Sequence, residues 1–297
     1  MKILFTGANG FLGKNVIPLL RKKSFEVSTF GTHNTDYVYD IAKEIPSLNE
    51  KFDIVFHAAG KAHSIPNNDE EKKKFYDVNF EGTKNLCKAL ENNLPDIFIF
   101  ISTVAVYGKD FGENIHEGFP LDGSTPYAKS KIMAEEFLQE WSRKNNVKLF
   151  IFRPPLIAGP NPPGNLGDMI KAIKSGKYFN IAGGKAQKSI FWVEDFAELT
   201  ALTINNKGGI YNVCDDVYPS FKEISNKISN ILGKKSPGSI PLFVAKTMAL
   251  VGDLIGKKAP INSLKLKKIT DSLTFSNTKI KEDFGFSPSD VMKKFQI

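Results

Sequence analysis

Short apolar runs alternate with longer amphipathic stretches through the first half of the chain. The apolar runs predict buried strands at residues 2–5, 26–30, 53–56, 97–101 and 148–152. The stretches between them, notably residues 70–92 and 127–143, predict helices. Strands and helices that alternate in this way form parallel βαβ units, in which helices cover both faces of the sheet. We therefore expect an α/β fold with a doubly wound parallel sheet, which binds ligands at the carboxyl ends of its strands.

The alternation of strand and helix patterns becomes less regular after Arg153. Residues 154–168 (PPLIAGPNPPGNLGD) are rich in proline and glycine and predict a long loop. A helical pattern over 194–205 and a short strand over 209–213 predict a return to the sheet. We expect a larger domain of residues 1–163, rejoined by 188–213, and a smaller, mostly helical lobe of residues 164–187 and 214–297.

Residues 240–256 (IPLFVAKTMALVGDLIG) form the most apolar stretch, which is too short to span a bilayer and contains Lys246 and Asp253. Five of its residues fall on one helical stripe: Val244, Thr247, Met248, Val251 and Ile255. We expect this stripe to pack on the protein body, with contact to a membrane surface as the alternative, and we expect no membrane partner.

Composition indicates a folded protein, with 41% hydrophobic and 24% charged residues. The start runs directly into a strand pattern without a cleavable apolar segment, so we expect no signal peptide. Two cysteines without metal-ligand spacing indicate a reduced cytoplasmic protein and no metal site. The net charge of +8 raises the question of a nucleic-acid partner, but the lysines are scattered and no nucleic-acid-binding motif occurs. An anionic small substrate explains the charge equally well.

A glycine-rich turn follows the first strand. In TGANGFLG, residues 6–13, Gly7, Gly10 and Gly13 stand three apart at a strand-to-helix junction. Glycines let the backbone approach a pyrophosphate closely, and the helix amino terminus supplies free N–H groups. We expect this loop to bind a dinucleotide through the three glycines together with Asn9, Phe11 and Leu12.

The second strand bears on which dinucleotide is bound. An acidic residue at its end would bind the adenosine ribose and repel a 2′-phosphate. Here the strand ends in Phe30-Gly31-Thr32-His33, with no acidic residue. We expect NADP(H), with Thr32 in contact with it and NAD as the alternative.

Tyr127 and Lys131 stand four residues apart in YAKSK. On a helix they share one face with the apolar Ala134 and Leu138, so the face is turned toward the sheet. A nearby ammonium and an oxidised nicotinamide ring would lower the tyrosine pKa from its usual value near ~10. The pair therefore predicts a catalytic dyad, with Tyr127 as general acid or base and Lys131 also holding the nicotinamide ribose.

These motifs resemble the extended short-chain dehydrogenase/reductases, specifically the NAD-dependent epimerase/dehydratase family that modifies nucleotide-activated sugars. The glycine spacing G-x-x-G-x-x-G carries the resemblance together with Y-x-x-x-K, H-A-A-G at 57–60, V-N-F-E-G-T at 78–83 and RPPLIAGP at 153–160. The resemblance implies a Rossmann-type dinucleotide-binding domain, a carboxyl-terminal substrate-binding lobe and, commonly, a homodimer. It also implies further residues that contact the cofactor or shape its site: Asp40, Ile41, Ala58, Ala59, Gly60, Asn79 and Pro154.

Thr103 matches the third catalytic hydroxyl of the family, with Ser102 as a second candidate. The resemblance also implies substrate contacts from Thr103, Asn165 and Lys188, the last at a position where many relatives carry a diphosphate-binding arginine. A lysine there keeps the charge but loses the bidentate geometry. His63 lies a few residues past the third strand, where it either contacts the sugar or is a loop residue without a role.

Two departures narrow the expected reaction. Where sugar 4,6-dehydratases carry an acidic pair, this chain has Val104-Ala105, and it lacks the acid/base cysteine of fucose synthases. We expect a 4-ketosugar reductase or a 4-epimerase acting on a nucleoside-diphosphate sugar. Two alternatives remain, a reductase of a hydrophobic ketone or alcohol of the sterol or flavonoid type, and a non-catalytic dinucleotide-sensing module.

Overall fold

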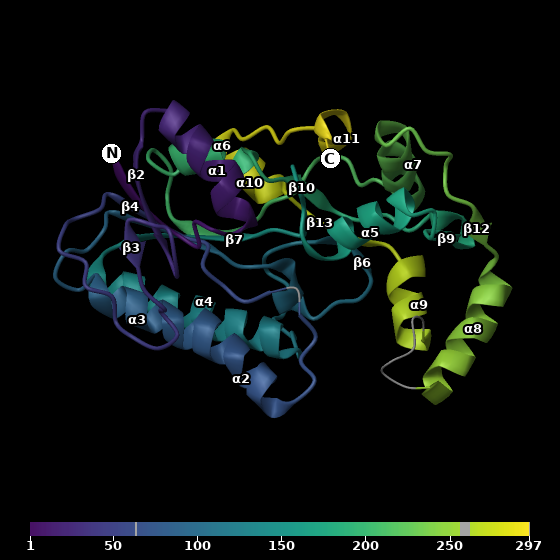
Figure 1. The fold of residues 1–297 in the computed structure, drawn as a ribbon. Coiled ribbons are helices and arrows are strands. Elements are labelled where there is room, and N and C mark those ends of the chain that lie inside the picture. The colour runs from purple at the N-terminus through teal and green to yellow at the C-terminus, as the bar shows by residue number, and fades with distance from the viewer. Residues whose placement is uncertain (63, 256–261, 297) are drawn as a thin grey trace.

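A seven-stranded parallel sheet forms the centre of the larger domain (Figure 1). The computed structural model describes residues 1–62, 64–255 and 262–296. The sheet order is β11-β7-β5-β4-β1-β2-β3, so the order reverses between β1 and β4. Its strands are β1 (Lys2–Thr6), β2 (Glu26–Gly31), β3 (Tyr37–Val38), β4 (Ile54–His57), β5 (Ile97–Ile101), β7 (Lys148–Arg153) and β11 (Gly209–Asn212). The predicted fold class and five strand positions are confirmed, and ligands bind at such a reversal point in open α/β sheets.

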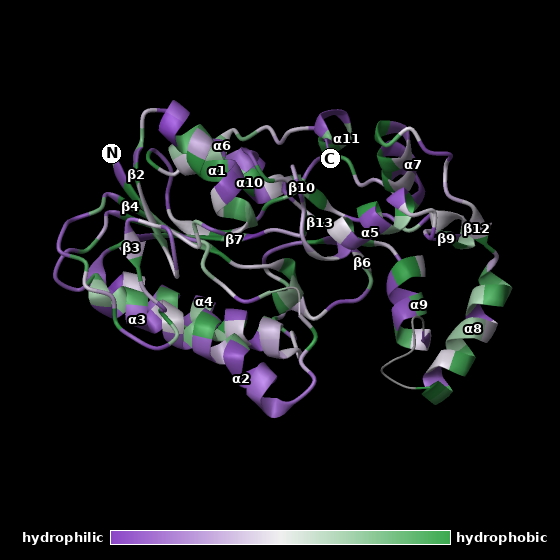
Figure 2. Cartoon of the chain, viewed as in Figure 1, coloured by the Kyte–Doolittle hydropathy of each residue, from purple (hydrophilic) through white to green (hydrophobic). Residues whose placement is uncertain are grey.

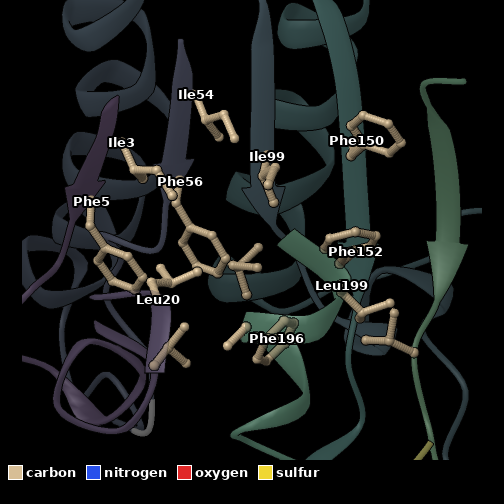
Figure 3. Close-up of a cluster of buried hydrophobic side chains, with 14 of the residues drawn as sticks. Ile3, Phe5, Leu20, Ile54, Phe56, Ile99, Phe150, Phe152, Phe196 and Leu199 are labelled. Carbon is tan, nitrogen blue, oxygen red and sulfur yellow. The ribbon is translucent and has the colours of Figure 1, made fainter. Parts of the chain in front are cut away.

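Helices cover both faces of this sheet (Figure 1). One face carries α1 (Phe11–Lys22), α6 (Asp195–Leu202) and α10 (Thr278–Phe284); the other carries α2 (Asp69–Tyr76), α3 (Gly82–Ala89) and α4 (Pro126–Asn145). Figure 3 shows part of the first core layer, where Phe5 and Phe56 stack with ring centroids 4.4 Å apart and Phe196 meets Phe56 edge-on. Because both faces are covered, the strands are apolar on both sides.

The smaller lobe is built from helices and three short parallel strand pairs. Its helices are α5 (Gly164–Lys174), α7 (Phe221–Ile231), α8 (Leu242–Ile255), α9 (Ser263–Thr270) and α11 (Val291–Lys294). The pairs are β6 (Gly112–Ile115) with β13 (Leu273–Phe275), β8 (Leu156–Ala158) with β10 (Ile190–Trp192), and β9 (Asn180–Ile181) with β12 (Ser239–Ile240). Short 3-10 turns follow β5 (η2, Val104–Tyr107) and β9 (η3, Ala182–Gly184).

Three sequence expectations differ from the structure. The predicted loop 154–168 contains β8 and the start of α5, because the short strand finds a partner in β10, more than thirty residues away. The predicted helix 70–92 is divided by a π-helical turn, η1 (Asp77–Glu81). Helix α10, assigned above to the smaller lobe, places Ile280 and Phe284 in the same core layer as Phe5.

The predicted packing of α8 is also wrong. Its buried residues are Ala245, Ala249 and Gly252, whereas Met248, Val251 and Ile255 of the predicted core stripe are exposed. Small side chains allow α8 to approach Leu266 of α9 closely, and the larger apolar side chains therefore face outward.

Candidate active site

The glycine loop is shaped so that only glycine fits at two of its positions. Gly7 has φ +77°, and a Cβ there would lie 2.8 Å from the backbone nitrogen of Ala59. A Cβ at Gly13 would lie 2.2 Å from the carbonyl oxygen of Ala8. Helix α1 begins directly after Gly10, which has no side-chain cap, and its first turn holds no acidic residue. The loop therefore fits the predicted pyrophosphate cradle at a helix amino terminus.

The residues predicted on the adenosine side lie around the end of β2. Thr32 is exposed there, and Asn9 lies over the same strand end, because a Cβ at Gly31 would meet its Oδ1 at 2.4 Å. The Asp40 carboxylate accepts a hydrogen bond from the backbone of Ala42 (3.2 Å) and pairs with the Lys43 ammonium. Ile41 is buried against the start of α3. Asp40 therefore caps a turn.

A buried histidine, which sequence analysis did not select, connects β1, β4 and α3. Thr6 Oγ1 lies 2.7 Å from His57 Nδ1, and His57 Nε2 lies 2.9 Å from Thr83 Oγ1. Thr6 also accepts a hydrogen bond from the backbone of Ala59, and Thr83 donates to the Asn79 carbonyl at 2.7 Å. These bonds are all satisfied when the Thr6 hydroxyl donates to Nδ1 and Nε2–H donates to Thr83. Burial, with a smaller contribution from Lys131, lowers the pKa of His57 to about 3, so the ring is neutral.

Asn79 joins the segment after β4 to helix α4. It lies in the π-helical turn η1, buried, and its Oδ1 accepts from the backbone N–H of Lys61 at 2.7 Å. Its Nδ2 donates to the Lys61 carbonyl and to Ser130 Oγ, at 3.1 and 2.9 Å. Ser130 in turn donates to the carbonyl oxygen of Tyr127 (2.8 Å). Asn79 thus fixes the position of α4 at the predicted dyad, and π-helical turns occur often at functional sites.

The predicted dyad lies in the first two turns of α4. Thr125 caps this helix by accepting from the N–H of Ala128, and Pro126 occupies the first turn. Lys131 is 4% exposed, and its ammonium donates to the Ile101 carbonyl (2.8 Å) and lies 4.4 Å from the centroid of the Phe100 ring. Burial lowers the pKa of Lys131 to about 8. The predicted inward face is confirmed, since Ala134 and Leu138 are fully buried.

Tyr127 and Thr103 are brought together from α4 and the end of β5. Burial raises the pKa of Tyr127, and a hydrogen bond with Thr103 opposes the increase. The raised pKa is opposite to the direction predicted for the complex with an oxidised nicotinamide, because burial of the phenol outweighs the hydrogen bond with Thr103. Gly60 completes the site, since a Cβ there would lie 3.5 Å from that ammonium. Tyrosine, lysine and threonine groups therefore converge at the carboxyl ends of β4 and β5.

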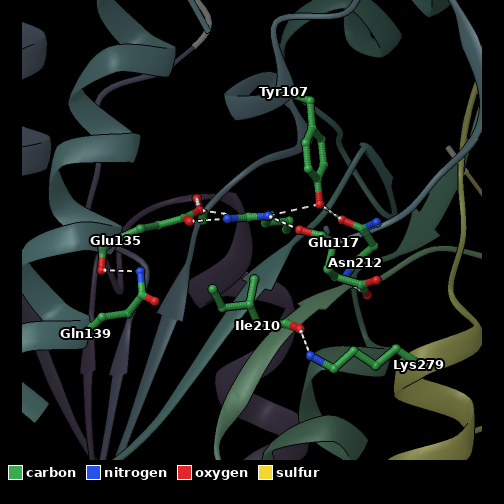
Figure 4. A network of polar contacts seen from close by, with 9 residues as sticks. Tyr107, Glu117, Glu135, Gln139, Ile210, Asn212 and Lys279 are labelled. Carbon is green, nitrogen blue, oxygen red and sulfur yellow. Dashed lines mark hydrogen bonds and ion pairs between the residues drawn. The ribbon is translucent and has the colours of Figure 1, made fainter. Parts of the chain in front are cut away.

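Ser102, the second candidate hydroxyl, belongs to a different environment. Its Oγ donates to the buried carboxylate of Glu135, which also forms an ion pair with Arg153. The Arg153 guanidinium donates to Tyr107 Oη at 3.0 Å, and Tyr107 donates to Asn212 Oδ1 at 2.7 Å (Figure 4). This buried polar network lies next to the site, because Ser102 precedes Thr103 and Glu135 follows Lys131 by one turn of α4.

Pro154 holds the segment that follows Thr103. Its carbonyl accepts a hydrogen bond from the N–H of Val104 at 3.1 Å, so the strand-to-loop turns after β5 and β7 are joined. Pro154 itself is buried.

Asn165 and Lys188, two of the predicted substrate residues, come from different segments of the chain. Asn165 is exposed in the first turn of α5, and Lys188 donates to the carbonyls of Lys268 and Asp271 at the end of α9, at 3.1 and 2.8 Å. Burial lowers the pKa of Lys188. His63 lies outside the described residues. Within the described part of the chain, no cluster of His, Cys, Asp or Glu could hold a metal ion, and no helix is long and apolar enough to cross a membrane.

Residues 3–214 match the NAD dependent epimerase/dehydratase family. The chain belongs to this family. It is therefore an NAD(P)-dependent enzyme of the extended short-chain dehydrogenase/reductase type, as predicted.

Among curated proteins, N-acetyl-alpha-D-glucosaminyl-diphospho-ditrans,octacis-undecaprenol 4-epimerase of Escherichia coli O157:H7 is 28% identical, over 94% of this chain and 88% of that one. UDP-glucose 4-epimerase of Vibrio cholerae is 25% identical, over 98% of this chain and 92% of that one. Among solved structures, RMD from Pseudomonas aeruginosa complexed with NADPH has a TM-score of 0.74 at 20% identity, over 99% and 95% of the two chains.

Proposed function

We propose that the protein is a 4-epimerase or 4-ketosugar reductase that acts on a nucleoside-diphosphate sugar. The convergence of Tyr127, Thr103 and Lys131 beside Gly60 carries this proposal. The family membership supports sugar chemistry, and the two curated relatives described above are named as 4-epimerases. The absence of an acidic pair at Val104-Ala105 argues against elimination, which requires a group to protonate the departing hydroxyl.

Each group has a distinct role in this mechanism. The nicotinamide dinucleotide supplies hydride transfer when bound, and the glycine loop, where a Cβ at Gly7 would collide with the backbone of Ala59, fits its pyrophosphate. Tyr127 exchanges a proton with the C4 oxygen of the sugar, and Thr103 orients that oxygen by a hydrogen bond. Lys131 contributes positive charge that favours the phenolate, while its contact with the Ile101 carbonyl fixes the position of the ammonium.

Replacing Tyr127 by phenylalanine tests the proposal. The variant removes one hydroxyl and should reduce kcat by at least about a hundredfold, because general acid/base groups contribute that much or more. Turnover is followed as loss of reduced-nicotinamide absorbance with 4-keto nucleotide sugars, and as interconversion of 4-epimers by chromatography. Tyr178→Phe in the smaller lobe is the matched control. Full activity of Tyr127→Phe, or no turnover of any diphosphate sugar by a protein that binds cofactor, would refute the proposal.

We propose NADP(H) as the preferred cofactor, with NAD as the alternative. The end of β2 presents Thr32 and no carboxylate, so a 2′-phosphate meets no like charge at this strand end. Titration with NADPH and NADH, followed by cofactor fluorescence, should give the lower Kd for NADPH. Equal or tighter binding of NADH would reverse the assignment.

A second substrate class is favoured by one relative. The Escherichia coli protein is named for a sugar carried on diphospho-undecaprenol, which shares the sugar diphosphate with a nucleotide sugar but has a lipid in place of the nucleoside. Parallel assays with a short polyprenyl-diphosphate sugar and with the corresponding UDP-sugar separate the two classes by their kcat/KM values.

A further inference from the structure

Helix α8 carries a row of large apolar side chains on the side that faces away from the protein. Figure 2 shows this helix as predominantly hydrophobic and at the periphery of the smaller lobe. Phe243, Leu250, Val251 and Leu254, here called the α8 stripe, recur at i, i+7, i+8 and i+11 and therefore lie on one face. Phe243 is 73% exposed and Leu254 90% exposed. We propose that α8 and α9 dock this protein onto an anionic lipid membrane surface.

The opposite face of α8 is already occupied, which fixes the direction of the stripe. Ala245 and Ala249 are buried against Leu266 of α9, with Ile181 and Ile240 packed around them. A helix whose small residues face the protein and whose large apolar residues face solvent has the reverse of the usual amphipathic arrangement. Exposed apolar patches of this kind mark interaction sites rather than folding requirements.

The dimensions of α8 favour a helix that lies in the membrane interface. Its 14 residues extend over about 21 Å, which is shorter than the hydrocarbon core of a bilayer. Interfacial helices of this kind bury their apolar face at the boundary between headgroups and acyl chains. Phe111, which is 54% exposed and lies 4.3 Å from the Lys267 ammonium, adds an aromatic ring next to α9.

The charge of the two helices identifies the partner. Helices α8 and α9 hold Lys246, Lys265, Lys267 and Lys268 against one acidic residue, Asp253, a net charge of 4 − 1 = +3. Asp110, which pairs with Lys268 at 2.9 Å, adds a second acidic residue, and the four lysines still outnumber Asp253 and Asp110. Anionic headgroups complement this charge. In a two-fold contact between copies of the chain the same lysines would face each other, so the charge disfavours a second copy as the occupant.

The docking surface adjoins a predicted substrate residue. The last turn of α9 ends where Lys188 donates to the carbonyls of Lys268 and Asp271. Docking through α8 and α9 therefore holds the Lys188 side of the smaller lobe near the plane of the lipid headgroups. This geometry applies whether the sugar diphosphate is soluble or lipid-linked, so the docking proposal is independent of the substrate class.

Vesicle flotation tests the proposal directly. The full-length protein is mixed with phosphatidylcholine vesicles that contain or lack phosphatidylglycerol, and the bound fraction is measured at low and high salt. We expect binding to the phosphatidylglycerol vesicles that weakens with salt. The double variant Phe243→Ser/Leu254→Ser should bind at least about tenfold more weakly, because two large apolar side chains no longer enter the bilayer. Lys246→Gln/Lys267→Gln should lose roughly tenfold on phosphatidylglycerol vesicles.

A matched control and a second measurement keep the result unambiguous. Val38→Ser replaces an exposed apolar residue on β3, at the far edge of the sheet, and should float like the wild type. Cofactor fluorescence confirms that each variant is folded. The proposal is overturned if wild-type protein does not float with phosphatidylglycerol vesicles, or if Phe243→Ser/Leu254→Ser floats equally well. It is also overturned if sedimentation shows that the stripe instead mediates self-association, which the double variant abolishes.

Discussion

The buried ion pair between Glu135 and Arg153 allows a quantitative test of how the polar network behind the active site is stabilised. Glu135 is fully buried and Arg153 is 2% exposed. The guanidinium donates to both carboxylate oxygens, through Nε at 3.1 Å and through Nη2. Replacing either partner leaves the other charge buried without its counter-charge. We propose to measure Glu135→Gln, Arg153→Met and the double variant as a cycle.

The structure sets the expected magnitudes. Removing one partner of a buried pair costs about 3–5 kcal/mol, so each single variant should lower the free energy of unfolding by that amount. The double variant removes both charges. Tyr107 would keep its hydrogen bond to Asn212 Oδ1, and the hydroxyl of Ser102 could donate to the new amide. The remaining cost is then about 1–2 kcal/mol, comparable to one or two lost hydrogen bonds.

Urea unfolding followed by tryptophan fluorescence measures these differences, because Trp141 of α4 is buried in a core layer. With an m-value of about 3 kcal/mol/M, each single variant should lower the unfolding midpoint by about 1 to 1.7 M. The double variant should be more stable than either single variant. Single variants within about 0.5 kcal/mol of the wild type, or additive losses, would refute the claim that the two charges depend on each other.

Three further predictions follow from the site. Lys131 has a pKa of about 8 in the folded protein against the ordinary 10.5, so as pH rises it loses its proton in the folded state first. We therefore expect kcat/KM to fall above pH 8, while the free energy of unfolding rises between about pH 8 and 10.5. Unchanged rates at pH 9 would contradict the role of the ammonium. Burial gives His57 a folded pKa of about 3, below the ordinary 6.5, so the unfolded chain binds a proton first and stability falls as pH drops below 6.5. His57→Gln should flatten this dependence between pH 5 and 7.5 in thermal unfolding. Gly13→Ala should weaken NADPH binding at least about tenfold, because the new Cβ would collide with the Ala8 carbonyl. Gly238→Ala is the control: a Cβ there has no contact below 3.5 Å, so this variant should bind NADPH as the wild type does.

Local pattern was sufficient to predict the sheet and the inward face of α4. Parallel strands covered on both sides are continuously apolar, so the five strands were found to within about two residues at each end. The four-residue spacing of Tyr127 and Lys131 is a property of the helix itself, and the glycine loop follows the first strand immediately. Each of these features depends on residues that are close in sequence.

The missed features depend on contacts between distant segments. His57 bonds to Thr6 and Thr83, which lie 51 and 26 residues away, and no local pattern records such a pairing. The packing of α8 was predicted incorrectly because the stripe with Met248 and Ile255 was expected to pack on the protein body. Ala245 and Ala249 pack against α9 instead. The contact of Lys188 with the end of α9, more than eighty residues away, could be seen only in three dimensions, and its role in a diphosphate site stays a prediction.

The π-helical turn at Asp77–Glu81 has a consequence for how insertions and deletions in this segment would be tolerated. A π-helical turn accommodates one residue more than an α-helical turn, so deleting one residue here would convert it to α-helix and leave the two flanking helical segments in phase. Thr83 and Leu86, now fully buried, would stay buried, and Phe75 would keep its place against Tyr127. A deletion within α3 itself would instead rotate the residues that follow by about 100° and turn buried side chains toward solvent.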